Sequence, residues 1–128
     1  MTQTLLVNKS DFADVALVST DEGPLAAGFI RVSVGPWALT SNNITYMAVG
    51  EQIGYWKFFE PEAYGISMDG FGRMPVWGYA KVTDSNCEDV AVGTMIYGFL
   101  PITQSFDMKP VKLTPLGFQD GNDHRTAL

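Results

Sequence analysis

The stretch that decides the fold is VWGYAKVT, which runs from Val76 to Thr83. Small or branched apolar residues occupy every second position, and bulkier or polar residues stand between them. A period of two is typical of a β-strand whose two faces meet different surroundings. The stretch therefore predicts a strand with valine, glycine and alanine on one face and Trp77, Tyr79 and Lys81 on the other.

Other β-prone runs lie on both sides of this strand in the sequence. Ala27–Val34 has the same period of two, and its Arg31 and Ser33 indicate a face that looks at solvent or at a partner. Gly35-Pro36 is expected to end that strand. The remaining predicted strands are Thr4–Val7, Asp14–Ser19, Met95–Leu100 and Phe106–Lys112.

A single short helix interrupts the strands. Ser41 has the side chain of a favoured N-cap, Asn42–Val49 form the predicted helix, and Gly50 is expected to end it. A helix of about two turns depends on packing for its stability. The next segment, Gln52–Pro75, is expected to be irregular, and such segments are usually functional or cover a core.

The 128 residues fit one domain, spanning residues 1–128. Hydrophobic residues make up 46% of the chain and charged residues 17%, which is typical of a globular protein. Short strands, closely spaced turns and little helix predict a mainly β fold. Because a sheet that closes on itself avoids exposed edges, we expect a small, partly open β-barrel with one or two short helices.

Charge and composition argue against several classes of partner. The formal net charge is −6 and the basic residues form no cluster, so we expect no nucleic-acid binding and no membrane binding. Cys87 is the only cysteine, which prevents an internal disulfide. The first residues lack the basic start and long apolar run of a signal peptide. The expected location is the cytoplasm.

Metal and nucleotide motifs are incomplete. One histidine and one cysteine cannot supply the ligand cluster of a conventional zinc site. Asp84–Glu88 is similar to the start of a calcium loop, but Asp89 and Met95 stand where that loop needs Gly and Glu. Gly70–Gly72 lacks the third glycine and the following helix of a phosphate-binding turn, so a flexible loop is the better interpretation.

Two segments keep a functional interpretation. Thr40–Tyr46 concentrates amides, hydroxyls and a phenol, which fit either a helix cap or a set of hydrogen-bond donors lining a cleft. Tyr55–Phe59 concentrates aromatic side chains, which fit either a core or interface anchor or the apolar wall of a ligand site. The sequence alone leaves both choices open.

Taken in order, these segments resemble the N-terminal, GroES-like half of the medium-chain dehydrogenase/reductases, on the quinone-oxidoreductase side of that superfamily. They resemble more closely an uncharacterised family of such reductase-like proteins. The matching segments are Leu39–Gly54, Tyr55–Phe59, Arg73–Ala80, Glu88–Pro101 and Asp123-His124-Arg125. Zinc-dependent members carry a metal-binding Gly-His-Glu where this chain has Trp77-Gly78-Tyr79. The resemblance therefore implies chemistry without zinc.

The resemblance also implies roles for individual residues. In reductases of this superfamily, the segment that matches Asn42–Tyr46 lies beside the nicotinamide. Tyr46 would be the catalytic residue, donating a hydrogen bond to the oxyanion that develops on a carbonyl or activated-alkene substrate. The residues that would face substrate or cofactor, or wall the pocket, are Asn42, Asn43, Thr45, Tyr55 and Trp56.

Members of the superfamily continue into a Rossmann domain that binds NADP, and this sequence ends at Leu128, where that domain would begin. We therefore expect this chain alone to bind no cofactor and to be inactive in isolation, with NADP required by a full-length protein. The alternative hypothesis is a non-enzymatic binding module. Its aromatic segment, Tyr55–Phe59, would form a homodimer with a second copy.

Overall fold

The VWGYAKVT stretch forms the centre of strand β5 (Pro75–Ser85) in the computed structural model, which describes residues 2–121. β5 pairs antiparallel with β3 (Ile30–Ala38) on one side and with β6 (Met95–Pro101) on the other. Strand β7 (Ser105–Met108) pairs with the free edge of β3. The sheet order is therefore β6-β5-β3-β7.

The other elements form two smaller sheets and a group of short helices. The remaining strands are β1 (Thr2–Asn8), β2 (Asp11–Thr20), β4 (Phe71–Gly72), β8 (Pro110–Thr114) and β9 (Gly117–Asp120). They form a three-stranded sheet of order β2-β1-β4 and a two-stranded hairpin, β8-β9. The helices are α1 (Ser41–Ala48), α2 (Gly50–Ile53) and the 3-10 helices η1 (Tyr55–Phe59) and η2 (Pro61–Tyr64).

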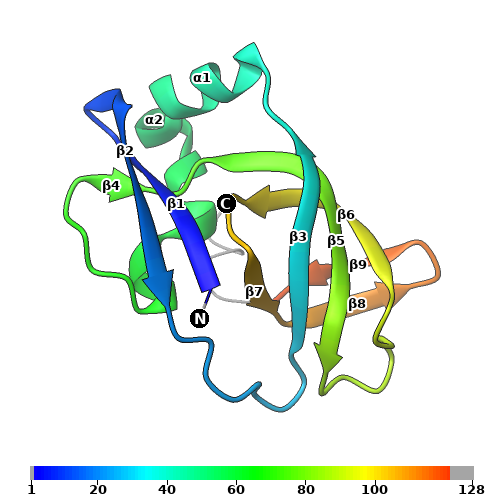
Figure 1. Ribbon diagram of the computed structural model, residues 1–128. Helices are drawn as coiled ribbons and strands as arrows, with labels where there is room; N and C mark the ends of the chain where they lie inside the picture. The colour runs from blue at the N-terminus through cyan, green and yellow to red at the C-terminus, as the bar shows by residue number, and fades with distance from the viewer. Residues whose placement is uncertain (1, 122–128) are drawn as a thin grey trace.

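The two larger sheets meet along β1. The backbone N–H of Leu5 donates to the carbonyl of Ile102, and the N–H of Gln104 donates to the carbonyl of Gln3, both at 2.9 Å. Figure 1 shows β1 and β2 on one side of the molecule and β3, β5 and β6 on the other, with α1 and α2 at one end and the β2–β3 connection at the opposite end. The prediction of a mainly β fold is confirmed, and its sheets are open.

The alternation predicted for β5 is confirmed. Val76, Ala80 and Val82 are fully buried, whereas Trp77 and Tyr79 are exposed. The buried face joins a core cluster of apolar side chains from β3, β5, β6 and β7 with Phe59 of η1. A second cluster, around Trp56, packs against the start of β5. Burial of these apolar surfaces is the main favourable contribution to folding.

The predicted end of β3 at Gly35-Pro36 is wrong. The strand begins later than expected, at Ile30, and continues through a cis Gly35-Pro36 bond to Ala38. Its register with β5 shifts between Val34 and Trp37. A bulge of this kind absorbs a proline within a paired strand, which is why the breaker signal in the sequence did not end the strand.

Of the two surroundings predicted for Arg31, solvent or a partner, the structure shows a partner within the chain, because β7 pairs with β3 and places Asp107 directly opposite Arg31. Arg31 is buried, and its Nε and Nη2 donate to the two carboxylate oxygens of Asp107 at 2.8 and 3.1 Å. The paired charges satisfy one another at the sheet edge. Ser33, on the same strand, is exposed as predicted.

The helix α1 is present, but its cap differs from the prediction. Thr40, not Ser41, is the N-cap: its hydroxyl accepts from the N–H of Asn42 at 3.3 Å, and its own N–H donates to Asn43 Oδ1 at 2.7 Å. This reciprocal arrangement is a capping box. α1 ends at Ala48 with Val49 as its C-cap, so Gly50 stands at the predicted C′ position, but α2 begins there and the left-handed residue is Gly54.

Two further differences concern the C-terminal half. The predicted strand Phe106–Lys112 is two strands, β7 and β8, separated at Lys109. The hairpin partner β9 was not predicted. Asp123-His124-Arg125 lies outside the described residues. No helix within residues 2–121 is long and apolar enough to cross a membrane.

Replacing Gly78 with alanine is expected to destabilise the protein. A Cβ at this position would lie 2.6 Å from Trp37 Cα and 2.7 Å from the Pro36 carbonyl oxygen, and backbone atoms cannot move aside cheaply. Overpacking of this kind costs about 1–3 kcal/mol. The matched control is Gly98→Ala on the paired strand, where a Cβ meets nothing within 4 Å. Urea denaturation compares the stability of the two variants. Equal midpoints would contradict the close packing of Gly78 against Trp37 and Pro36.

Replacing Asn43 with alanine is expected to lower the free energy of unfolding by about 1–3 kcal/mol. The buried Asn43 amide accepts from Thr40 N–H and donates to the Pro75 carbonyl at 3.0 Å. The variant would leave this N–H and this carbonyl without their hydrogen-bond partner. Asn42→Ala is the control, since the Asn42 side chain is exposed. Thermal and chemical denaturation compare the two variants. Equal stability would show that Asn43 is not the structural link between α1 and β5.

Candidate functional site

Seven aromatic side chains from β5, β6, α1 and η1 form a connected cluster of rings, here named the aromatic face. Four rings come from β5 and β6, one from α1 and two from η1. Each ring lies within 6.1 Å, centroid to centroid, of at least one other. The aromatic face consists of Tyr46, Tyr55, Phe58, Trp77, Tyr79, Tyr97 and Phe99.

The antiparallel register of β5 and β6 builds the strand half of the aromatic face. Trp77 stands directly opposite Phe99, and Tyr79 stands opposite Tyr97. Their ring centroids are 4.8 and 5.0 Å apart. Because side chains alternate along a strand, the register that points Val76 into the core also points these rings outward.

The helical segment supplies the other half. The Tyr46 ring meets the Tyr55 ring edge-on at 5.0 Å and the Phe99 ring at 5.6 Å. Phe58 stacks on Tyr55 at 6.0 Å and also reaches Phe99 at 5.6 Å. Phe99 therefore joins the helical rings to the strand rings, with geometries that aromatic pairs favour.

Much of this surface is open to solvent. Trp77 is 46% exposed, Tyr79 47% and Tyr97 61%. The hydroxyls of Tyr46 and Tyr55 make no hydrogen bond with any other residue of the described chain. A contiguous exposed aromatic surface with unused hydroxyls is typical of a site that binds another molecule.

A cleft borders the aromatic face between β6 and the β8-β9 hairpin. Its volume is about 1060 Å³, and Phe58, Tyr97 and Phe99 line the side that belongs to the aromatic face. Residues 112–120 of the hairpin form the opposite wall, and Figure 1 shows the hairpin next to the lower part of β6. The cleft is large enough for a small organic molecule.

The structure brings together two of the six predicted site residues, Tyr46 and Tyr55. Asn42 and Thr45 lie on the exposed side of α1, whereas the buried Asn43 amide is used by the cap and by Pro75. Trp56 lies in the core, and it is only 4% exposed.

Glycines make room for Trp56. A Cβ on Gly72 would lie 2.5 Å from Trp56 Cε3, and a Cβ on Gly50 would collide with the indole nitrogen. The Tyr55–Phe59 segment thus turns Trp56 and Phe59 inward, and only Tyr55 and Phe58 of its rings reach the aromatic face. Its interpretation as a core or interface anchor fits Trp56 and Phe59, which are buried, and Phe58 also packs against the core cluster.

Sequence reasoning missed the strand rings as site residues, above all Phe99, which contacts four of the other rings. A usable signal was present. Two antiparallel strands with period-two patterns, Val76–Thr83 and Met95–Leu100, place their aromatic residues on one face once the register is known.

The glycines at Gly70–Gly72 have structural roles. Gly70 has a positive φ of 77°, and Gly72 lies in β4 against Trp56. The next long element is β5, so this turn does not deliver a helix N-terminus to a phosphate. Among the side chains that the structure describes, no group of three or more His, Cys, Asp or Glu is arranged to hold a metal ion.

Comparison with known protein families gives a match over most of the chain. Residues 37–128 match a family described as "Protein of unknown function (DUF2855)", and this range contains every residue of the aromatic face. No curated protein matches the chain. Because the matched range covers more than half of the sequence, the chain belongs to the DUF2855 family of proteins of unknown function.

Proposed function

We propose that this chain is the substrate-side, GroES-like domain of a zinc-independent, NADP-dependent reductase-like protein, with the aromatic face as one wall of the substrate site. The observation that carries the proposal is the edge-on contact of Tyr46 and Tyr55 beside Phe99. It places two unused phenol hydroxyls at the border of an exposed aromatic surface. The mainly β fold with short helices agrees with the resemblance described above.

The chemistry of the aromatic face suits a flat, conjugated carbonyl compound such as a quinone or an enone. Trp77 and Tyr97, whose rings stack at 5.9 Å, offer a surface on which a planar molecule can lie. The Tyr46 hydroxyl would donate a hydrogen bond to the substrate oxygen on which negative charge develops. Tyr55, in contact with the Tyr46 ring, would hold that ring in position.

The residues of this chain do not fit the NADP pyrophosphate. Gly70–Gly72 packs against Trp56 and is followed by a strand, and the net charge of the chain is −6. The proposal therefore assigns NADP to a separate domain of the whole protein. Tyr46 and the strand rings would form the side of the site that faces the substrate.

In a protein that contains both domains, Tyr46→Phe is expected to lower kcat on the order of 10²-fold with a small change in KM, because it removes a donor used in the transition state. NADPH oxidation with a panel of quinones and enones measures this. Ser41→Ala, which removes an exposed hydroxyl from the same helix, is the control and should keep full activity. The isolated 128-residue chain should show no NADPH oxidation above background.

Two results would count against the proposal. One is NADPH oxidation by the isolated chain. The other is unchanged turnover in Tyr46→Phe. The coding sequence after Leu128 adds an inexpensive test, since a continuing βαβ pattern with a glycine-rich turn supports a reductase and a stop codon favours a binding module.

The exposure of the aromatic face also favours a second candidate, a non-enzymatic module that binds its own copy. The contact would use the strand rings, because the buried Trp56 and Phe59 of the Tyr55–Phe59 segment are not available. Exposed aromatic residues are enriched at interfaces between proteins.

For this candidate, sedimentation velocity over a range of concentrations is expected to show a dimer that Tyr97→Lys disrupts. The added charge would be desolvated within an aromatic contact. Leu17→Lys is a matched control, since Leu17 is 64% exposed on β2 and lies outside the aromatic face. A strict monomer at all concentrations, or equal disruption by both variants, would rule out self-association through this surface.

A further inference from the structure

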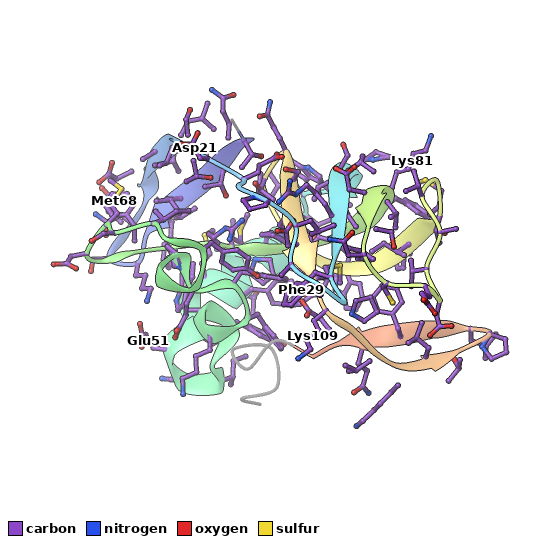
Figure 2. The ribbon with its side chains drawn as sticks, turned by 90° about the horizontal axis from the view of Figure 1, so that it is seen from below. Asp21, Phe29, Glu51, Met68, Lys81 and Lys109 are labelled. Carbon is purple, nitrogen blue, oxygen red and sulfur yellow. The ribbon has the colours of Figure 1, made fainter. Side chains whose placement is uncertain are left out.

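A second cavity lies beneath the β2–β3 connection, at the end of the molecule opposite α1 and α2 (Figure 1). Its volume is about 400 Å³, within the range of small-molecule sites. Figure 2 looks at this end and shows the connection running from Asp21 to Phe29, both of which border the cavity. No residue of the aromatic face lines it.

Arg73 lines this cavity and is one of the largest fully buried side chains, with 2% exposure. It lies between β4 and β5, in the RMP segment that leads into the central strand. Its guanidinium carbon is 4.4 Å from the centroid of the Tyr64 ring. Its Nε and Nη1 are buried and have no hydrogen-bond partner in the part of the chain that the structure describes.

Arg31, the other buried arginine among the described residues, differs from Arg73 because it is paired with carboxylates. Arg31 has a bidentate pair with Asp107 and a second carboxylate, Glu22, at 3.5 Å. The hydrogen bond to Asp107 raises the pKa of Arg31, whereas burial lowers the pKa of Arg73 to about 10. Arg73 therefore still carries its charge at neutral pH, without a described carboxylate to balance it.

Several of the other polar groups that line the cavity already have partners. The hydroxyls of Thr4 and Thr103 donate to backbone carbonyls, and Ser105 donates to Glu22. Two of the three carboxylates that line the cavity, Glu22 and Asp107, pair with Arg31, and the third, Asp21, is exposed. Among the described cavity residues, the buried donors that make no hydrogen bond are Nε and Nη1 of Arg73. Burying a charged donor without a partner is costly, and a bound anion would remove that cost.

We infer that this cavity is a binding site for a small organic carboxylate, with the carboxylate group on Arg73 and the apolar part of the ligand against Tyr64, Phe29 and Phe106. A planar guanidinium matches a carboxylate in shape and charge. The aromatic side chains supply the apolar wall that small-molecule sites need. The inference does not depend on the function proposed for the aromatic face.

Charge around the cavity selects a monoanion. Asp21 stands exposed at the rim, and Glu22 and Asp107 lie in the wall. These three carboxylates would repel a dianionic phosphate. A monoanionic carboxylate would be attracted by the charge of Arg73 and repelled about half as strongly by the three carboxylates. A carboxylate with an aromatic or aliphatic body is therefore the favoured class.

The test uses sodium benzoate as the probe, at constant ionic strength, against the 15N-labelled 128-residue chain. Benzoate is expected to shift the Nε–Hε resonance of Arg73 in a saturable, one-to-one manner. Benzamide, which has the same shape without the charge, should bind about tenfold more weakly or not at all. Inorganic phosphate should also bind more weakly than benzoate.

Arg73→Met is the diagnostic variant. It should weaken benzoate binding by about tenfold or more. Its unfolding midpoint without ligand should equal or exceed that of the unaltered protein, because an unpartnered buried charge has been replaced by an apolar side chain. Lys81→Met removes the same charge at an exposed site on the opposite side of the view from Asp21 (Figure 2) and should leave benzoate binding unchanged.

Three results would overturn the inference. If benzoate gives no saturable shift in the millimolar range, the cavity is not a carboxylate site. If Arg73→Met binds benzoate as tightly as the unaltered protein, the site does not include Arg73. If phosphate binds more tightly than benzoate, the ligand class is not an organic carboxylate. If Arg73→Met fails to fold, the comparison of benzoate with benzamide on the unaltered protein still decides the question.

Discussion

The close backbone approach of β5 to β3 at Gly78 and Trp37 determines the geometry on which the rest of the structure depends. It sets which residues of β5 point inward, and so places Val76, Ala80 and Val82 in the core. A shift of one residue in a β ladder would exchange the two faces of the strand. The same contact therefore holds the core together and presents the aromatic face to the outside.

The sequence predicted those parts of the fold that depend on local pattern. β1, β2, β5, β6 and α1 lie where period and turn signals placed them. It misplaced the parts that depend on neighbours. The continuation of β3 through Gly35-Pro36 requires the bulge against β5, and the burial of Arg31 requires Asp107 of β7, far away along the chain. No local pattern contains that information.

The same distinction applies to the candidate sites. The resemblance drew attention to Tyr46 and Tyr55, and the structure brings these rings together. The local sequence could not show that Trp56 turns inward between glycines, or that Phe99 connects the helical and strand rings. The sequence could not identify Arg73 as a candidate ligand-binding residue. What distinguishes Arg73 is that its buried Nε and Nη1 make no hydrogen bond, and only the folded structure shows this.

The two cavities differ in how firmly their walls are held. The cavity at Arg73 is framed by both larger sheets, which are joined through the backbone of β1. One wall of the outer cleft is the β8-β9 hairpin, a separate two-stranded sheet whose Phe118 packs against the core cluster. Isolated hairpins have little stability of their own. The outer cleft should therefore open and close by local unfolding of the hairpin on a timescale independent of the core, so that exchange of a large ligand there need not disturb the rest of the fold.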